Sequence, residues 1–301
     1  MFIARVVCSN SRDRVPAMNF RRQPKRPSQP AGTNEAVLQQ AIFALEDGRL
    51  KEAEFLAADV LKCRPVDPRA LQIFGNALLL QGEAEQAIAP LAQAARRTHD
   101  PVIEMQAAMA LSRAGRSDDA LAWLERATKR RPPFPPAFHV YGTMLASLDR
   151  SDEAIDATRR GLALMPDVAE LSTLLGDLLT NRGDHAGART AYTQALAKAP
   201  RHVDALWGLA RAHEALGAFG QAAEAFRRML AIAPDEQAAR VGLGVCLLEI
   251  GRPDEGLELF RAASRNGDKM YGESLIALAK ASRGRFWLRP SAAKRVLREQ
   301  L

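Results

Sequence analysis

A small turn residue recurs about every 34 positions along this chain, and an alanine or glycine follows each one five residues later. The seven turn positions are Gly48, Gly82, Gly115, Asp149, Gly183, Gly217 and Gly251, and the residues that follow them are Ala53, Ala87, Ala120, Ala154, Ala188, Ala222 and Gly256. Apolar residues at helical spacing flank every turn. This periodicity predicts stacked helix-turn-helix units, each burying its apolar face against its neighbours.

Prolines stand where most of these units should end, because a fixed φ and a missing N–H stop a helix. They are Pro65, Pro132, Pro166, Pro200 and Pro234. We therefore expect seven modules over residues 34–267. The composition of residues 1–33, rich in Arg, Pro and Ser, predicts a basic disordered arm. Residues 268–301 are expected to form a capping helix and a basic tail.

The recurring pattern resembles the tetratricopeptide repeat. Residues 169–202 carry it most fully, through Leu175, Gly176, Leu179, Gly183, Ala188, Tyr192, Ala195 and Pro200. The next unit matches through Leu209, Ala210, Gly217, Ala222, Phe226 and Pro234. The resemblance covers about four-fifths of the chain. It implies an all-α fold, a right-handed α-solenoid of about seven helix-turn-helix repeats with a C-terminal capping helix.

The positive charge of the chain belongs to its two ends. The formal net charge is +7, of which residues 1–34 supply about +6 and residues 282–301 about +5, so the repeats between them carry about −4. This distribution does not provide a phosphate-binding stripe along the array. The sequence therefore does not favour nucleic acid as the partner, although tethering through the basic ends remains a third hypothesis.

Cysteine usage and hydropathy indicate a reducing compartment. The three cysteines form no C-x-x-C or histidine-linked pattern, so neither a disulfide framework nor a zinc site is predicted; they are Cys8, Cys63 and Cys246. Residues 1–8 are too short, and interrupted by Arg5, for the core of a signal peptide. No apolar run approaches the roughly 18 residues that cross a bilayer. We expect a soluble, cytoplasmic protein.

Two further features of the sequence bear on its source and its ends. The 34 arginines against 8 lysines favour a bacterial genome rich in GC. Either Met1 or Met18 is compatible with the true start. Phe286 and Trp287, which lie among basic residues, are expected to fold back on the capping helix, with an exposed hook for a partner or RNA as the alternative.

No set of residues converges on catalysis. The histidines are scattered and have no second ligand at metal spacing: His99, His139, His185, His202 and His213. The acidic pairs open second helices, where negative charge is stabilising: Asp118-Asp119, Asp152-Glu153 and Asp254-Glu255. The run Gly242-Leu243-Gly244 has Leu247 in place of the third glycine of a dinucleotide fingerprint. We expect no catalytic, cofactor-binding or metal site, and no enzymatic activity.

The resemblance implies a concave groove, lined in similar proteins by the fifth, ninth and twelfth positions of each module. From these positions we predict a peptide-binding groove formed by Gln72, Asn76, Met105, Met109, His139, Thr143, Thr173, Asp177, Trp207 and Arg211. Over all seven modules the lining is polar in the middle and apolar at both ends, where the same positions hold Leu38, Ile42 and Leu45 and Val241, Val245 and Leu248. Methionines in the lining adapt well to a partner's shape. The apolar ends are expected to be covered by the arm and by the capping helix, with exposure to a partner as the alternative.

The carboxylate clamp of chaperone-binding tetratricopeptide proteins is absent. Those proteins carry Lys and Asn at the fifth and ninth positions of one module, whereas this chain has Gln72 and Asn76 in its second module and Leu38 and Ile42 in its first. The function we predict is a non-enzymatic scaffold that binds another protein or peptide, extended or helical, in its groove. The alternative is a regulatory or substrate-recruiting subunit of an enzyme or transferase system encoded on another chain. The partner, the pathway and the oligomeric state are not specified by the sequence.

Overall fold

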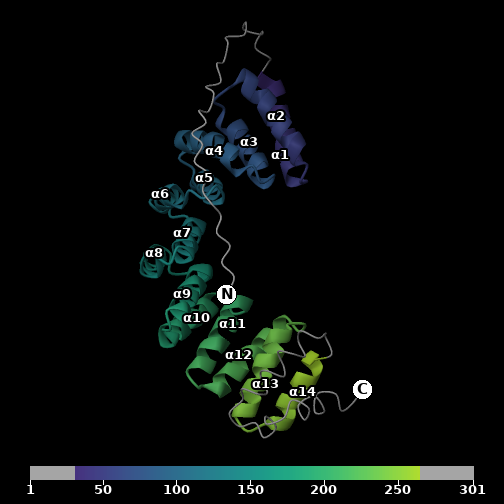
Figure 1. Cartoon of the computed structure of the whole chain (residues 1–301), viewed down its shortest axis with the longest axis vertical. Helices are drawn as coiled ribbons and strands as arrows, with labels where there is room; N and C mark the ends of the chain where they lie inside the picture. Colours follow the sequence, from purple (N-terminus) through teal and green to yellow (C-terminus); the bar gives the residue numbers. More distant parts are fainter. Residues whose placement is uncertain (1–30, 265–301) are drawn as a thin grey trace, which may run out of the picture.

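Fourteen helices in seven pairs make up residues 31–264, the part of the chain that the computed structural model describes (Figure 1). The pairs are α1 (Ala31–Glu46) and α2 (Leu50–Cys63), α3 (Pro68–Leu80) and α4 (Ala84–Thr98), α5 (Pro101–Arg113) and α6 (Ser117–Thr128), α7 (Pro135–Ser147) and α8 (Ser151–Leu164), α9 (Ala169–Asn181) and α10 (His185–Lys198), α11 (Val203–Ala215) and α12 (Phe219–Ile232), and α13 (Gln237–Glu249) and α14 (Pro253–Ser264). This region contains no strand, and the predicted all-α repeat fold is confirmed.

Left-handed backbone joins the two helices of every pair. All seven predicted turn residues have positive φ, from +59° at Asp149 to +87° at Gly82. Glycine reaches this region without a steric penalty, and aspartate is among the few other residues that tolerate it. The N–H groups that follow such a turn bond back to the last helical carbonyls: Gly183 donates to Thr180 and Asp184 to Leu179, both at 2.9 Å. The repeat found in the sequence is thus a repeat of helix C-caps.

A small residue on the first helix of a pair lets a large residue of the second helix approach closely. A Cβ added at Gly176 would lie 2.5 Å from the ring of Tyr192, and one added at Gly75 would lie 2.5 Å from Leu91. The ring of Tyr192 also packs on Gly208 of the next module, where a Cβ would lie 2.3 Å away. One buried side chain therefore joins two modules.

The core runs the length of the array as a thin continuous layer. The alanines that follow the turns are completely buried: Ala53, Ala87, Ala120, Ala154, Ala188 and Ala222. One buried cluster extends from Leu71 to Leu247, and a smaller one covers the first module around Leu38. Each module depends on its neighbours for burial, as stacked repeats do.

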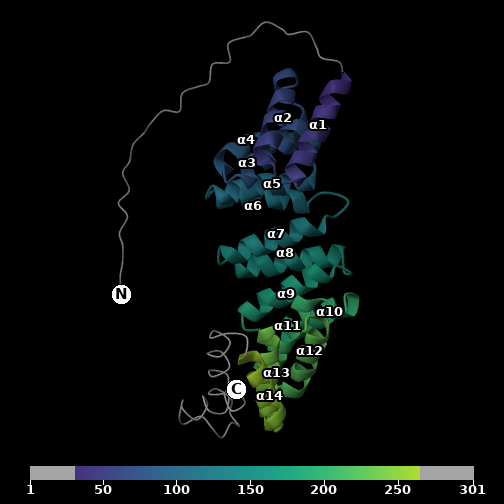
Figure 2. The same ribbon diagram turned by 90° about the vertical axis from the view of Figure 1, so that its right-hand side faces the viewer.

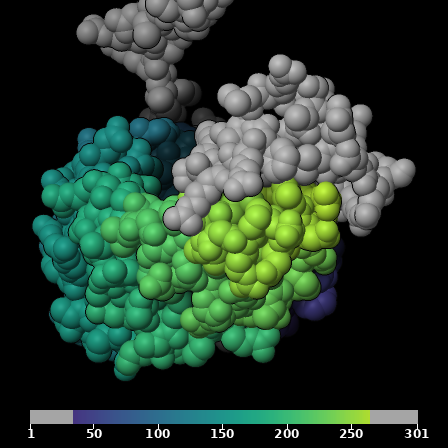
Figure 3. Space-filling model, turned by 90° about the horizontal axis from the view of Figure 1, so that it is seen from below, coloured from purple at the N-terminus to yellow at the C-terminus, as the bar shows by residue number. Residues whose placement is uncertain are grey.

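The first helices of successive modules form the inner layer of the array. From α1 to α11, each odd-numbered helix contacts the next odd-numbered one as well as its own partner. In Figure 1, α6 and α8 lie on the outer edge while α5 and α7 lie inward, and Figure 2 shows the same stack from the side. Seen from the C-terminal end, the teal middle modules lie to one side and the purple N-terminal residues emerge on the other (Figure 3). The pairs therefore wind around the long axis.

The expected arm and cap fall largely outside the described residues. The segments concerned are 1–30 and 265–301, which include the Phe286-Trp287 segment. Helix α1 begins at Ala31, three residues before the Asn34 at which we expected the first module to start. The first N–H groups of a helix need no intrahelical partner, so the sequence defines such a start only loosely.

The close contact at Tyr192 predicts a large stability difference between two glycine substitutions. Gly208→Ala places a methyl group inside the ring of Tyr192 and should cost about 2–3 kcal/mol. Gly220→Ala, in the first turn of α12 with open space around it, should be neutral or stabilising by a few tenths of a kcal/mol. Urea unfolding followed by circular dichroism checks this, and equal midpoints for the two variants would contradict the packing described.

Candidate functional site

The predicted groove residues lie on the five inner helices α3, α5, α7, α9 and α11, two on each helix. Those at the ninth module position are the more accessible, because Met109, Thr143, Asp177 and Arg211 are exposed and Asn76 is half-buried. Those at the fifth position lie deeper: Gln72, Met105, His139 and Trp207 are half-buried, and Thr173 is buried. The ninth positions therefore provide most of the surface that a ligand could contact.

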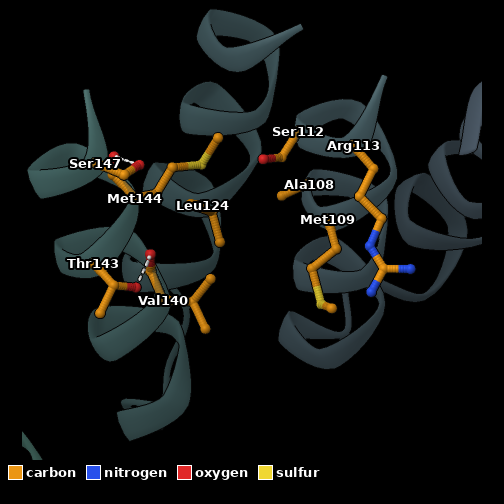
Figure 4. Close-up of a pocket in the computed structure, with 9 residues that line it drawn as sticks. All are labelled: Ala108, Met109, Ser112, Arg113, Leu124, Val140, Thr143, Met144 and Ser147. Carbon is orange, nitrogen blue, oxygen red and sulfur yellow. Dashed lines mark hydrogen bonds between the residues drawn. The ribbon is translucent and has the colours of Figure 1, made fainter. Parts of the chain in front are cut away.

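A pocket of about 300 Å³ opens between α5 and α7 (Figure 4). It brings together two predicted groove residues from neighbouring modules, Met109 and Thr143. Its lining also includes residues that the sequence did not single out: Ala108, Arg113, Leu124, Val140, Met144 and Ser147. The sixth and thirteenth module positions, which supply Val140 and Arg113, would have revealed part of this lining if they had been read alongside the fifth, ninth and twelfth.

Three of the polar side chains around this pocket are already bonded to the protein. The Thr143 hydroxyl donates to backbone carbonyls of its own helix at 3.0 Å, and the Ser147 hydroxyl donates to the Met144 carbonyl at 2.7 Å. Arg113 donates from its guanidinium to the Leu79 carbonyl at 3.0 Å. The apolar groups of Met109, Val140 and Leu124 thus provide the surface that is free for burial (Figure 4).

Asp177 is held in the groove by a buried tyrosine. The Tyr192 hydroxyl donates to the Asp177 carboxylate at 2.7 Å and lies 3.3 Å from the Thr180 hydroxyl. Burial raises the pKa of Asp177 above its usual range, whereas the hydrogen bond from Tyr192 lowers it and the charge of Asp204 raises it. The carboxylate is therefore both oriented and partly desolvated before any ligand arrives.

Trp207 and Arg211 lie on the next inner helix, α11, and both are engaged with neighbouring side chains. The Trp207 ring meets Phe226 edge to face, with ring centroids 5.6 Å apart. Arg211 pairs with Glu214 at 2.6 Å, and the Cys246 thiol donates to the other Glu214 oxygen at 3.6 Å. Burial raises the pKa of Glu214 and that of Cys246. These contacts connect the groove to the core of the following module.

On the N-terminal side, the wall is joined across modules by an amide pair. The Gln72 side chain on α3 donates to that of Gln106 on α5 at 3.1 Å. Met105 packs partly buried against the core. These two predicted residues thus support the wall as well as line it.

Neither a metal site nor a membrane span is found among the described helices. Within residues 31–264, no three His, Cys, Asp or Glu side chains lie together as a metal site would require. No helix in this range is long and apolar enough to cross a membrane.

Sequence models of the tetratricopeptide repeat match residues 105–169, 173–237 and 214–281, together more than half of the chain. Among solved structures, a tetratricopeptide repeat protein from Parabacteroides merdae is similar, with a TM-score of 0.55, 16% identity, and coverage of 82% of this chain and 99% of that one. PilF of Pseudomonas aeruginosa is similar at a TM-score of 0.54 and 15% identity, covering 69% of this chain and 96% of that one. At these identities, the similarity shows the fold alone.

Two curated proteins resemble parts of the chain. A probable biofilm formation methyltransferase, WspC, of Pseudomonas aeruginosa is 38% identical over 89 residues, which are 30% of this chain and 21% of that protein. The CTR9 homolog of Arabidopsis thaliana is 32% identical over 135 residues, 43% of this chain and 12% of that protein. The chain thus spans well under two thirds of the length of either relative.

The fold and the inner wall define an α-solenoid of helix-turn-helix repeats. Proteins of this class serve generally as scaffolds for protein interactions. With the sequence matches above, the chain belongs to the tetratricopeptide repeat family.

The hydrogen bond at Asp177 predicts a measurable change in its titration. Tyr192→Phe keeps the ring in the core but removes the hydroxyl that stabilises the charged carboxylate. The pKa of Asp177, already raised by burial, should therefore rise further in this variant. Carbon-13 NMR of the aspartate carboxyl groups measures it. An unchanged or lowered midpoint in Tyr192→Phe would show that the hydroxyl does not act on Asp177.

Proposed function

We propose that this protein is a non-enzymatic scaffold that binds an extended or helical segment of another protein in its concave groove. The observation that carries the proposal is the pocket between α5 and α7, where two modules contribute apolar side chains to one accessible hollow. The hydroxyls of Thr143 and Ser147 at its rim are already bonded to backbone carbonyls, so a ligand would gain mainly from apolar burial. An apolar pocket lined by adaptable methionines suits a polypeptide ligand.

The ten predicted residues belong to this proposal with different roles. Met109, Thr143, Asp177 and Arg211 offer exposed contacts, and Asn76 offers an amide that is partly accessible. The half-buried residues Gln72, Met105, His139 and Trp207 would contact a ligand through their accessible edges. Thr173 is buried and its hydroxyl donates to the Ala169 carbonyl at 3.0 Å, so it would act only by shaping the wall.

A matched pair of double variants tests the groove. Met109→Glu with Thr143→Glu places two charges at the pocket, whereas Ala89→Glu with Ala122→Glu places the same charges on exposed positions of α4 and α6. The second pair should be harmless because the same module position naturally holds Glu224 in α12 and Glu258 in α14.

The first step is to find proteins that the wild-type chain and the control pair capture from a lysate and that the groove pair does not. These proteins are then purified, and their binding to each variant is measured by calorimetric titration. We expect the dissociation constant to rise at least about tenfold in the groove pair. Circular dichroism verifies that each variant is folded. If a purified partner binds the groove pair and the wild type equally well, the groove is not the binding surface.

The second candidate is a regulatory or substrate-recruiting subunit of an enzyme system encoded on another chain. The sequence similarity to part of a probable methyltransferase is the observation that favours this candidate. In this case one of the captured partners would be an enzyme, and its rate on its own substrate would change on addition of the wild-type chain but not of the groove pair. A rate that is the same with and without the wild-type chain would exclude this candidate for that enzyme.

A further inference from the structure

Two carboxylates follow the apolar pocket along the inner wall. Asp177 lies on α9 and Asp204 on α11, the next two inner helices beyond α7, and both are exposed. Their charges act on each other, and the basic groups whose charges act on Asp177 are the imidazoles of His139 and His202. Within residues 31–264 neither carboxylate forms an ion pair, although acids on the outer helices such as Glu153 pair with arginine at 2.7 Å.

The environment of Asp177 makes its negative charge available to a ligand. The Tyr192 hydroxyl fixes one carboxylate oxygen and cannot neutralise the charge, because it is a neutral donor. Partial burial raises the pKa of Asp177, although its side chain remains exposed to a ligand. A cation placed against such a carboxylate gains more than it would from a fully hydrated one.

Two arginines near this wall, both among the described residues, are already bonded to groups of the protein. Arg211, about two turns beyond Asp204 on the same helix, pairs with Glu214 at 2.6 Å. Arg113, at the pocket, donates to the Leu79 carbonyl. Within residues 31–264 no lysine or arginine pairs with Asp177 or Asp204, which leaves both carboxylates open to a cationic side chain of a partner, and the repeats carry about −4, which favours a basic segment.

We propose that the groove selects a segment of another protein in which an apolar side chain enters the pocket between α5 and α7 and a lysine or arginine further along meets Asp177 and Asp204. This proposal rests on the proposed function, since it requires that the groove binds polypeptide. It gives that function a specificity, apolar followed by basic, opposite in charge to the free carboxylate that a clamp of lysines would hold. An acidic segment would be repelled by the same two residues.

Selection from a random linear peptide library displayed on phage tests this specificity. The baits are the full wild-type chain, the charge variant Asp177→Asn with Asp204→Asn, and the groove pair Met109→Glu with Thr143→Glu. Asparagine can still accept the Tyr192 hydrogen bond, so the charge variant should keep the wall intact. The matched control for charge is Asp156→Asn with Glu224→Gln, which removes two exposed carboxylates from the outer helices α8 and α12.

We expect the wild type and the control to enrich peptides that combine an apolar residue with Lys or Arg. Peptides enriched on the charge variant should keep the apolar residue and lose the preference for a basic one. The groove pair should enrich neither feature. A peptide from the wild-type selection, made synthetically, should bind about fivefold to tenfold more weakly to the charge variant, and the difference should shrink at high salt.

The two levels of the proposal fail in different ways. Two results would overturn the specificity and leave the groove as the binding surface. The first is that peptides which bind the wild type and not the groove pair carry no basic residue. The second is that such peptides bind the charge variant as tightly as the wild type. If no peptide is enriched on the wild type relative to the groove pair, both the specificity and the proposed function are wrong.

Discussion

The close packing of a large side chain on a glycine of an inner helix governs the rest of this structure. Where Gly176 meets Tyr192 and Gly75 meets Leu91, the helices approach more closely than any larger residue would allow. The same ring of Tyr192 packs on Gly208 of the next module, and Phe226 packs on Gly242 in the same way. Because Tyr192 and Phe226 each pack against two modules, the core sets the spacing of the inner helices there, and the groove takes its shape from that spacing.

The fold could be predicted from the sequence because its determinants are local. A positive φ between two short helices requires glycine or a tolerant substitute such as Asp149, so the turns can be recognised one by one. The buried alanines follow each turn at a fixed distance, since they lie one helical turn into the second helix. What the sequence left open was the start of the array, where α1 begins at Ala31 because a helix N-terminus has no obligatory partner.

The details of the groove were harder to predict because they depend on contacts between modules. Thr173 and Asp177 lie on the same wall, yet Thr173 is buried and Asp177 is exposed. This difference in exposure depends on how α9 packs between its neighbouring helices. Glu104 is a second example. Its completely buried carboxylate pairs with Arg126 at 3.1 Å and with Arg130. The same module position holds the apolar residue Phe138 in the next repeat. Periodicity alone gives no sign of such a substitution.

In the proposed binding mode, stability and recognition depend on the same side chains, because the inner wall is only one helix thick. The ring of Tyr192 fills the space between α9, α10 and α11, while its hydroxyl reaches Asp177 on the inner surface. A change at this ring would therefore alter the packing of two modules as well as the orientation of a groove carboxylate. The exposed ninth positions have no such double role at Met109 and Thr143, whose side chains border the open pocket. We infer that partner specificity in this array is freer to vary at the pocket between α5 and α7 than at Asp177, where the groove and the core are held by the same residue.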